Sequence, residues 1–486
     1  MDSLYEHLKE YSKTDFYPYH MPGHKRRLCG QLPHDMISLD ITEIDNFDNL
    51  HDASGILSDI QKKVATMCQA DESFLQVNGS TGGVLVAISA AVSKGGKILM
   101  ARNCHKSAYH AVYLRELEVQ YLYPPILEGF DYYDAVTPKQ VEEELRSQKT
   151  PGEIKAVMIV SPSYEGRIAD VQAIAEITHK YQIPLIVDEA HGAHLGFAEG
   201  FALNSNQLGA DLVIQSVHKT LPALTQTALL HVNGNLIDRN LVKRFCKIFQ
   251  TSSPSYLLMA SIENGLNLVE IYKESLFGEF RKNYLEMIRK LSDCCRYLRF
   301  VDRNEYDQEP IRQDVGKLVI DCSKAPITGK QLYDRLRDNY HIQLEMACEK
   351  YCLAMFTIAD DKEAYERMMT ALSQIDASLE KLQNKGFSEI YSNSESDTSM
   401  IMTEQPVINI NVIRDQSEEI SFWKAWDLET QRMPLKDAKG YIAGEFISLY
   451  PPGSPVLVPG EMITEKHLEQ INSCLEKGLH VEGIYF

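Results

Sequence analysis

Basic residues are in the minority in this sequence. Its 486 residues include 49 lysines and arginines against 68 aspartates and glutamates, which gives a formal net charge of −19. Proteins that bind nucleic acid or an anionic membrane surface need clusters of positive charge. The charge balance therefore argues against both kinds of partner, and it is compatible with a small cationic substrate.

The sequence also shows no long apolar run and no zinc pattern, and we do not expect its first residues to form a secretory leader. No apolar run is long enough to span a bilayer, and Met1–Lys9 is charged and periodic instead of carrying an apolar core behind a basic tip. The ten cysteines are scattered, and the close pairs Cys294 with Cys295 and Cys348 with Cys352 lack a second pair of zinc ligands. We expect a cytoplasmic protein with reduced thiols, no membrane segment and no metal.

What the sequence does contain is a regular α/β rhythm. From about residue 70, short apolar runs alternate with helix-length segments, which predicts right-handed crossovers and a mainly parallel sheet. The predicted strands are Phe74–Val77, Lys97–Ala101, Val119–Tyr123, Ala156–Val160, Leu185–Val187, Leu212–Ile214 and Ala228–Val232. The predicted helices between them include Gly83–Val92, Val141–Arg146 and Val171–Tyr181.

The chain is too long for one ordinary core, so several domains are expected. The segment Tyr17–Arg26 holds two prolines and a glycine, which favours an extended arm, and the strands Lys317–Asp321 and Leu353–Ile358 indicate a smaller α+β domain. The predicted divisions are an amino-terminal arm (1–40), a large domain (41–295), a small α+β domain (296–385), a Ser- and Asn-rich linker (386–405) and a carboxyl-terminal α/β module (406–486).

The strongest chemical signal is Lys219, which follows a strand-like run that ends in Ser216, Val217 and His218. A lysine at the carboxyl end of a strand lies where open α/β sheets bind ligands. If it is partly desolvated, its amine can lose a proton near neutral pH and attack an aldehyde. The alternative is an ordinary solvated loop lysine, so independent partners are needed.

A second strand ends in Asp188, followed by Ala190, His191 and His194. A carboxylate there can hold a cationic ring nitrogen, and the small side chain of Ala190 lets a flat ring lie close. A metal bound by Asp188, His191 and His194 is the alternative, but no further ligand follows at a suitable spacing.

Two further features complete the set. The turn at Ser80, Thr81 and Gly82 opens an apolar helix, so its N–H groups and hydroxyls form an anion site for one phosphate. It lacks the lysine of a P-loop and the spacing of a dinucleotide turn, and its other reading is a flexible turn with helix caps. His105, after another strand, could stack on a planar ring. An anion site, a carboxylate, a ring stacker and a lysine amine together describe a site for pyridoxal 5'-phosphate.

Several motifs closely resemble the bacterial ornithine/lysine/arginine decarboxylase family over nearly the whole chain. They are His20-Met-Pro-Gly-His-Lys25, Asp40-Ile-Thr-Glu43, Asn49-Leu-His-Asp52, Gly79-Ser-Thr-Gly82, Asn103-Cys-His-Lys-Ser107, Asp188-Glu-Ala-His-Gly192, Ser216-Val-His-Lys-Thr220 and Pro459-Gly-Glu461. The resemblance implies a fold-type-I, aspartate-aminotransferase-like large domain, with active sites at a dimer interface. The chain resembles short members that lack an amino-terminal wing domain, which favours a homodimer or a tetramer.

The resemblance also implies residue roles. Lys219 carries the cofactor as a Schiff base, Asp188 is the partner of its ring nitrogen and His105 stacks on the ring. The residues implied around the phosphate are Ser80, Thr81, Ser216 and His218.

The activity implied by the resemblance is α-decarboxylation of a basic amino acid in polyamine biosynthesis. Arginine to agmatine is the first choice, with lysine to cadaverine or ornithine to putrescine as alternatives. Either Glu461 or Glu345 would bind the cationic side chain, and either His191 or Lys219 would protonate Cα.

Two other functions stay open at this point. An aminotransferase or another fold-type-I enzyme would use the same cofactor, and Arg312, Arg335 and Arg337 are the arginines available to clamp an α-carboxylate, although none sits in a recognisable motif. A non-catalytic regulator that kept the fold is the more remote alternative.

Overall fold

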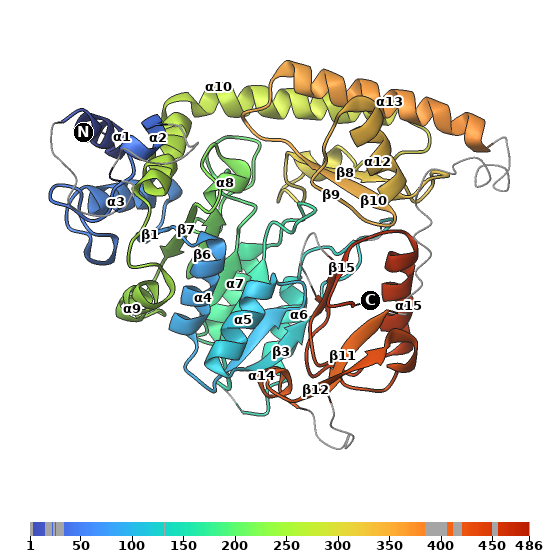
Figure 1. Cartoon of the computed structure of the whole chain (residues 1–486), viewed down its shortest axis with the longest axis horizontal. Coiled ribbons are helices and arrows are strands. Elements are labelled where there is room, and N and C mark those ends of the chain that lie inside the picture. The colour runs from blue at the N-terminus through green and yellow to red at the C-terminus, as the bar shows by residue number, and fades with distance from the viewer. Residues whose placement is uncertain are drawn as a thin grey trace.

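The computed structural model shows a large sheet region, a smaller α+β region and a carboxyl-terminal region packed together (Figure 1). The described residues are 3–14, 22, 25, 34–130, 132–150, 152–383, 406–411, 420–449 and 455–485. The predicted linker 386–405, and the predicted extended arm apart from Pro22 and Lys25, lie outside these ranges. The five predicted divisions and the four boundaries between them stay predictions.

The largest sheet has seven strands in the order β1-β7-β6-β5-β4-β2-β3. Their bounds are β1 (Glu72–Gln76), β2 (Lys97–Ala101), β3 (Glu118–Leu122), β4 (Ile154–Val160), β5 (Leu185–Asp188), β6 (Leu212–Ser216) and β7 (Ala228–Val232). Neighbours from β6 to β3 are parallel, whereas β7 runs antiparallel to β6 and β1. The mainly parallel sheet is confirmed. The reversal at β7 was not predicted, and it follows from a connection too short for a crossover.

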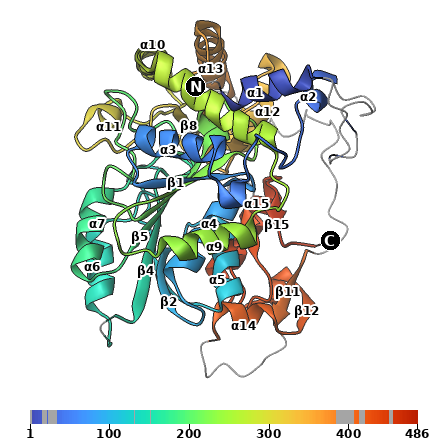
Figure 2. The same ribbon diagram turned by 90° about the vertical axis from the view of Figure 1, so that its left-hand side faces the viewer.

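Helices cover both faces of this sheet, with α6 and α7 on one side and α4, α5 and α9 on the other (Figure 2). Their bounds are α4 (Gly79–Ala91), α5 (Lys106–Arg115), α6 (Pro138–Arg146), α7 (Val171–Lys180) and α9 (Arg239–Phe249). Helix α4 packs against β6 and β7 as well as against α5 and α9. A helix buried in this way is apolar nearly all round, as its sequence is. This packing fixes the start of α4 at the carboxyl ends of the strands.

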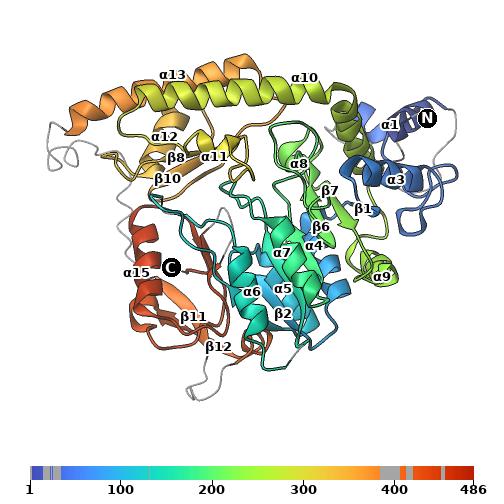
Figure 3. The same cartoon turned by 180° about the vertical axis from the view of Figure 1, so that it is seen from behind.

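The smaller region carries an antiparallel sheet in the order β8-β10-β9. Its elements are β8 (Lys317–Asp321), β9 (Met346–Ala347), β10 (Tyr351–Met355), α11 (Asn304–Asp307), α12 (Gly329–Tyr340) and α13 (Lys362–Gln383). The 39-residue helix α10 (Tyr256–Cys294) runs from the large region and packs along α13 (Figures 1 and 3). The smaller α+β region agrees with the prediction.

The carboxyl-terminal region holds a two-stranded and a three-stranded sheet. Its elements are β11 (Val407–Asn411), α14 (Phe422–Trp426), β12 (Thr430–Pro434), η2 (Leu435–Asp437), β13 (Ile447–Leu449), β14 (Pro455–Leu457), α15 (Glu465–Glu476) and β15 (Val481–Glu482). The ring of Tyr109 on α5 packs edge-on against Phe422 and Phe446, with centroids 6.0 and 5.8 Å apart. These aromatic contacts attach the region to the large sheet region.

The amino-terminal elements pack on the large region through α10. Leu4 and Leu8 of the first helix are buried, and the Leu4 N–H donates to Glu263 Oε2 at 2.7 Å. The remaining elements are α1 (Leu4–Ser12), α2 (His34–Ser38), η1 (Leu50–Asp52), α3 (Ile56–Cys68) and α8 (Val217–Thr220). Across the described ranges no helix is both long and apolar enough to cross a membrane, and the nine cysteines found there are free thiols.

Candidate active site

The predicted cofactor residues meet at one edge of the seven-stranded sheet. Asp188 ends β5, Ser216 ends β6 and Lys219 follows in the short helix α8. Since β5 and β6 are parallel neighbours, their ends lie side by side. The Ser216 hydroxyl donates to Ser80 Oγ at 2.9 Å, which joins the lysine segment to the predicted phosphate turn.

The first residues of α4 include glycine at two positions where the structure requires it. Gly79 has a φ of +69°, and its N–H donates to the Gln226 carbonyl at 3.0 Å. A side chain at Gly83 would place its Cβ 2.9 Å from Ile214 Cγ2, so the first turn of α4 lies directly on β6. The glycines therefore position the helix start against the strand that leads to the lysine.

The start of α4 presents polar groups on that edge. Ser80 is partly exposed, Thr81 is exposed and Gly82 is buried. The first N–H groups of a helix have no acceptor within the helix, and its N-terminus favours a negative charge. With the Ser80 and Ser216 hydroxyls beside them, these groups are suited to a phosphate.

Asp188 is a buried carboxylate, with 4% of its surface exposed. Within the described ranges it accepts a hydrogen bond from the Ala190 N–H at 3.1 Å. Burial raises the pKa of Asp188, and the nearby charge of Lys219 opposes that rise. A buried carboxylate is stable only with a compensating partner, which a protonated ring nitrogen would supply. Ala190 is itself buried and small, as predicted for a position beside a flat ring.

The Lys219 amine lies close to an imidazole. Its Nζ is 3.1 Å from His191 Nε2, and the ring of Tyr164 packs edge-on against His191 with centroids 4.7 Å apart. Burial lowers the pKa of Lys219, while the charges of Asp188 and Glu345 oppose the effect. A lowered pKa favours the neutral form of the amine, which is the form that attacks an aldehyde.

The other two predicted histidines also flank the lysine. Burial, together with the charges of Lys219 and Lys106, lowers the pKa of His105 to about 4, so this ring is neutral at physiological pH. His105 caps α5, where its Nδ1 accepts from the Ser107 N–H at 3.2 Å. Nδ1 of His218 lies 2.8 Å from the Thr227 carbonyl, which fixes it as the protonated nitrogen and leaves Nε2 as an acceptor.

Within the Asp188-Glu-Ala-His191 motif, Glu189 has different partners from Asp188 and His191. Glu189 points away from the site and accepts from the Ser205 N–H at 2.8 Å and from Gln215 Nε2 at 2.6 Å. Burial raises the pKa of Glu189 to about 7. Glu189 therefore anchors the polypeptide, whereas His191 contacts Lys219 and the charge of Asp188 acts on Lys219.

The chemistry of these donors fits pyridoxal phosphate. The phosphate would lie on the first turn of α4 and the hydroxyls, the ring nitrogen on Asp188 and the aldehyde carbon on Lys219. The His105 imidazole is neutral and suited to stacking on a ring face. Each group of the cofactor thus has a matching group at this edge of the sheet.

The two glutamates predicted for the substrate lie in different settings. Glu345 is exposed and accepts a hydrogen bond from the Tyr164 hydroxyl, and its charge acts on both Lys219 and Lys317. Glu461 forms a two-pronged ion pair with Arg102, at 3.1 Å to Nε and 2.9 Å to Nη2. Glu345 therefore lies within the electrostatic reach of the lysine, while the charge of Glu461 is already paired.

Lys317 and Tyr164 also contribute to the site, and neither was predicted. Lys317 Nζ lies 2.7 Å from His191 Nδ1, although Lys317 begins β8 in the smaller region. A lysine in front of an apolar strand gives no signal of such a contact. Tyr164 lies on the loop after β4, where the sequence carries no motif that would single it out.

The metal alternative has no support in the described ranges. His194 Nε2 bonds to Asp314 Oδ1 at 2.8 Å, and no group of three or more His, Cys, Asp or Glu side chains there could hold a metal ion. Of the arginines considered for an aminotransferase, Arg337 is paired with Asp334 and Asp338 on its own helix.

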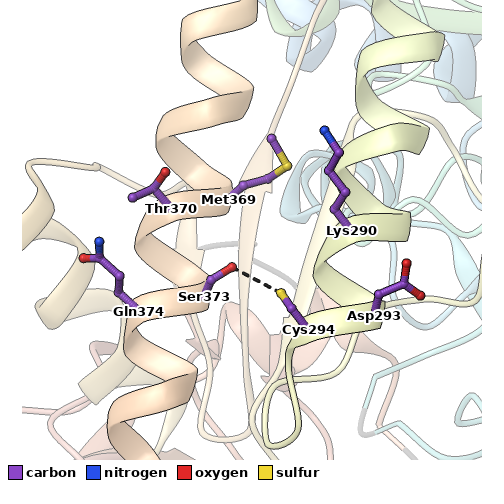
Figure 4. A pocket seen from close by; sticks show the side chains of 7 residues that line it. All are labelled: Lys290, Asp293, Cys294, Met369, Thr370, Ser373 and Gln374. Atoms are coloured by element: carbon purple, nitrogen blue, oxygen red, sulfur yellow. Dashed lines mark hydrogen bonds between the residues drawn. The ribbon is translucent and has the colours of Figure 1, made fainter.

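A cavity of about 560 Å³ lies elsewhere, between α10 and α13 (Figure 4). It is lined by Lys290, Asp293, Cys294, Met369, Thr370, Ser373 and Gln374. None of these residues belongs to the strand-end site.

Comparison with known proteins identifies the family of the chain. Residues 2–308 match the family described as Orn/Lys/Arg decarboxylase, major domain, and residues 415–476 match the C-terminal domain of the same family. The chain is 28% identical to an arginine decarboxylase of Bacillus anthracis, over 99% of this chain and 94% of that protein. It is 24% identical to the inducible lysine decarboxylase of Escherichia coli, over 99% of this chain and 78% of that protein.

Solved structures support the same fold. A lysine decarboxylase of Francisella novicida superposes with a TM-score of 0.79 at 18% identity, over 99% of this chain and 79% of that chain. The predicted fold type is confirmed. Pyridoxal phosphate is the cofactor of this enzyme, as the family match and the donor set agree. The chain belongs to the ornithine/lysine/arginine decarboxylase family.

Proposed function

We propose that this protein removes the α-carboxylate of L-arginine to give agmatine, with lysine and ornithine as slower substrates. The observation that carries the reaction class is the group formed by buried Asp188, buried His191 and half-buried Lys219 beyond the carboxyl ends of β5 and β6, in a chain of this family. The observation that favours arginine is full-length similarity to several proteins named arginine decarboxylase.

The residues divide the work as follows. When bound, pyridoxal phosphate supplies an aldehyde that captures the substrate amine and a ring that accepts the electrons left by CO₂. Burial lowers the pKa of Lys219, which favours the neutral amine that attacks an aldehyde. Asp188 stabilises a proton on the ring nitrogen, and the first turn of α4 holds the phosphate.

The substrate side chain needs a negative partner. Glu345 is exposed, and it lies near enough to Lys219 for the two charges to interact. A carboxylate can hold a guanidinium through two parallel hydrogen bonds, which an ammonium does not match. Glu345 is therefore our first candidate for this contact, and Glu461 is the second.

We further propose a cytoplasmic homodimer or tetramer with active sites at the subunit interface, whose amine product enters polyamine synthesis. The free cysteines suit a reducing compartment. Tyr123, Ile126 and Tyr133 expose 62, 56 and 49% of their surfaces, an apolar set that a second subunit could cover. Analytical ultracentrifugation tests this assembly, and a strictly monomeric active enzyme would contradict it.

The function is tested with the purified, cofactor-loaded protein. Arginine, lysine and ornithine labelled at the carboxyl carbon are supplied in turn, and labelled CO₂ and the product amine are measured. We expect CO₂ and agmatine in equal amounts from arginine, and no product from Lys219→Ala. Product formation that requires an added keto acid would instead indicate an aminotransferase, and the absence of product from all three substrates would favour a non-catalytic homologue.

A further inference from the structure

A chain of three nitrogen-bearing side chains crosses from the smaller region into the active site. Lys317 Nζ lies 2.7 Å from His191 Nδ1, and His191 Nε2 lies 3.1 Å from Lys219 Nζ. Lys317 exposes 2% of its surface, although lysine is rarely buried. The imidazole of His191 thus joins two lysines from different regions of the molecule.

The approach of Lys317 depends on close packing around it. Gly166 has a φ of +94°, and a side chain there would place its Cβ 2.6 Å from Lys317 Cβ and 2.6 Å from Gln313 Nε2. The Asp314 N–H donates to the Gly166 carbonyl at 2.8 Å, so the start of β8 is tied to the loop after β4. The position of Lys317 is therefore fixed by the backbone hydrogen bond between Asp314 and Gly166 as well as by the contact of its Nζ with His191.

Hydrogen-bond chemistry fixes where the protons lie in this chain. A lysine ammonium has only donors, so it requires Nδ1 of His191 to be an acceptor. A neutral imidazole that accepts at Nδ1 carries its proton at Nε2. That proton then faces Lys219 Nζ at 3.1 Å, which can accept it in the neutral form of the amine, the form that burial favours.

The surroundings favour this protonation pattern near neutral pH. Burial lowers the pKa of Lys317 to about 8, an effect that the charge of Asp314 opposes and that of Lys219 reinforces. Burial and the charges of Lys317 and Lys219 lower the pKa of His191 well below its usual value. Glu345 and Glu165 are the other carboxylates that act on Lys317, and Met355 Sδ lies 3.6 Å from its Nζ.

We propose that Lys317 is a positioning residue that holds His191 in the tautomer with its proton on Nε2, facing Lys219 and the reacting carbon. The inference rests on the decarboxylase function proposed above. It makes His191 the group that protonates Cα. When the Nε2 proton leaves, Nδ1 takes a proton from the Lys317 ammonium, so the ring stays neutral. A proton from solvent then returns to Nε2 as Nδ1 gives its proton back to Lys317, which restores the starting tautomer.

The first test uses the apoprotein and needs no turnover. An amine-reactive acylating reagent labels Lys219 at a series of pH values, and mass spectrometry gives the rate at that residue. Loss of Lys317 frees Nε2 of His191 to accept from a Lys219 ammonium. In Lys317→Met we therefore expect the labelling midpoint of Lys219 to move to higher pH, with labelling about tenfold slower at pH 8.

Two controls show whether the effect passes through His191. Lys330, on α12, is ion-paired with Asp334 on the surface, and Lys330→Met should leave the Lys219 midpoint unchanged. In a His191→Phe background, Lys317→Met should cause no further shift, because the mediating ring is gone. An unchanged midpoint in Lys317→Met, or an equal shift in the His191→Phe background, would overturn the proposal.

The second test uses the loaded enzyme and its pH profile. In the wild type we expect kcat to fall as the pH rises through about 8, since Lys317 then loses its proton. We expect Lys317→Met to lower kcat about 10²-fold, with KM changed far less, and to abolish this alkaline limb. Lys317→Arg should recover part of kcat and move the limb to higher pH, since a guanidinium keeps its proton.

The outcomes separate this proposal from the proposed function. If no basic amino acid is decarboxylated, the function fails, and the labelling of the apoprotein still decides the role of Lys317. If the wild type is active and Lys317→Met shifts neither midpoint nor pH profile, only the role of Lys317 fails. If Lys317→Met does not fold, Lys317→Arg decides the question. A pH profile of kcat whose alkaline limb is unchanged in Lys317→Arg would overturn the positioning role of Lys317.

Discussion

The proposed cofactor half and the proposed substrate half of the active site are built differently. Asp188 and Ser216 are buried strand ends, and Lys219 follows one of them within three residues. Glu345 is exposed and meets Tyr164, which belongs to another region of the chain. The cofactor half is therefore set by one sheet, whereas the substrate half depends on how separate regions come together.

This difference predicts unequal effects of mutation in the two halves. Asp188→Asn keeps the shape of a buried side chain but removes the charge that would hold a protonated ring nitrogen. We expect kcat to fall about 10²- to 10³-fold, the range found for loss of one preorganised electrostatic partner. Steady-state kinetics with saturating cofactor measure the loss, and a change below tenfold would contradict the role of Asp188.

In the substrate half, Glu345→Gln removes a charge that would pair with the substrate side chain. We expect KM for arginine to rise about tenfold, roughly 1.4 kcal/mol of binding, with a smaller change in kcat. Tyr164→Phe is the matched control, since it removes the hydroxyl that Glu345 accepts from while keeping the ring against His191. An unchanged KM in Glu345→Gln would move the substrate contact to another carboxylate.

Glu461 is the second candidate for the substrate contact, but its charge is already paired with Arg102. Glu461→Gln breaks the pair with Arg102, which is only 12% exposed, and should reduce stability by about 1–3 kcal/mol with little effect on KM. Thermal unfolding and substrate titration distinguish the two effects. A large rise in KM without loss of stability would show that Glu461 reaches the substrate.

Beneath the cofactor half, Glu189 gives a pH-dependent effect on stability. Its pKa, raised to about 7 from an ordinary value near 4.5, means that the folded state retains its proton longer than the unfolded state. Its favourable contribution is complete below about pH 4.5 and is lost as the pH rises through about 7, by up to about 3 kcal/mol. The free energy of unfolding, measured between pH 5 and pH 8, should therefore change less with pH in Glu189→Gln than in the wild type.

Much of the cofactor half could be predicted from the sequence, because its residues follow strands that are visible as apolar runs. β2 and β7 agree with the predicted ranges at both ends, and Asp188, Ser80 and Ser216 lie at the edge where the α/β rhythm places them. Helix α4 begins at Gly79, four residues earlier than predicted. Its first turn was missed because the glycines there have low helix propensity.

The contacts between regions could not be predicted in the same way. The pairs Lys317 with His191 and Arg102 with Glu461 join residues 126 and 359 positions apart. No local period or turn signal records such a pairing, because it depends on how folded regions dock. The antiparallel direction of β7 likewise depends on the length of the connection from β6, and the residues of β7 themselves do not indicate it.

The most direct measurement of the central claim is to locate the cofactor on the chain. The loaded protein is reduced with borohydride, which fixes the cofactor to the lysine that holds it, and the digested protein is analysed by mass spectrometry. We predict that the modification lies on Lys219 and that Lys317, the buried lysine on the other side of His191, stays unmodified. Modification of Lys317 or of another lysine, or no modification at all, would contradict the account.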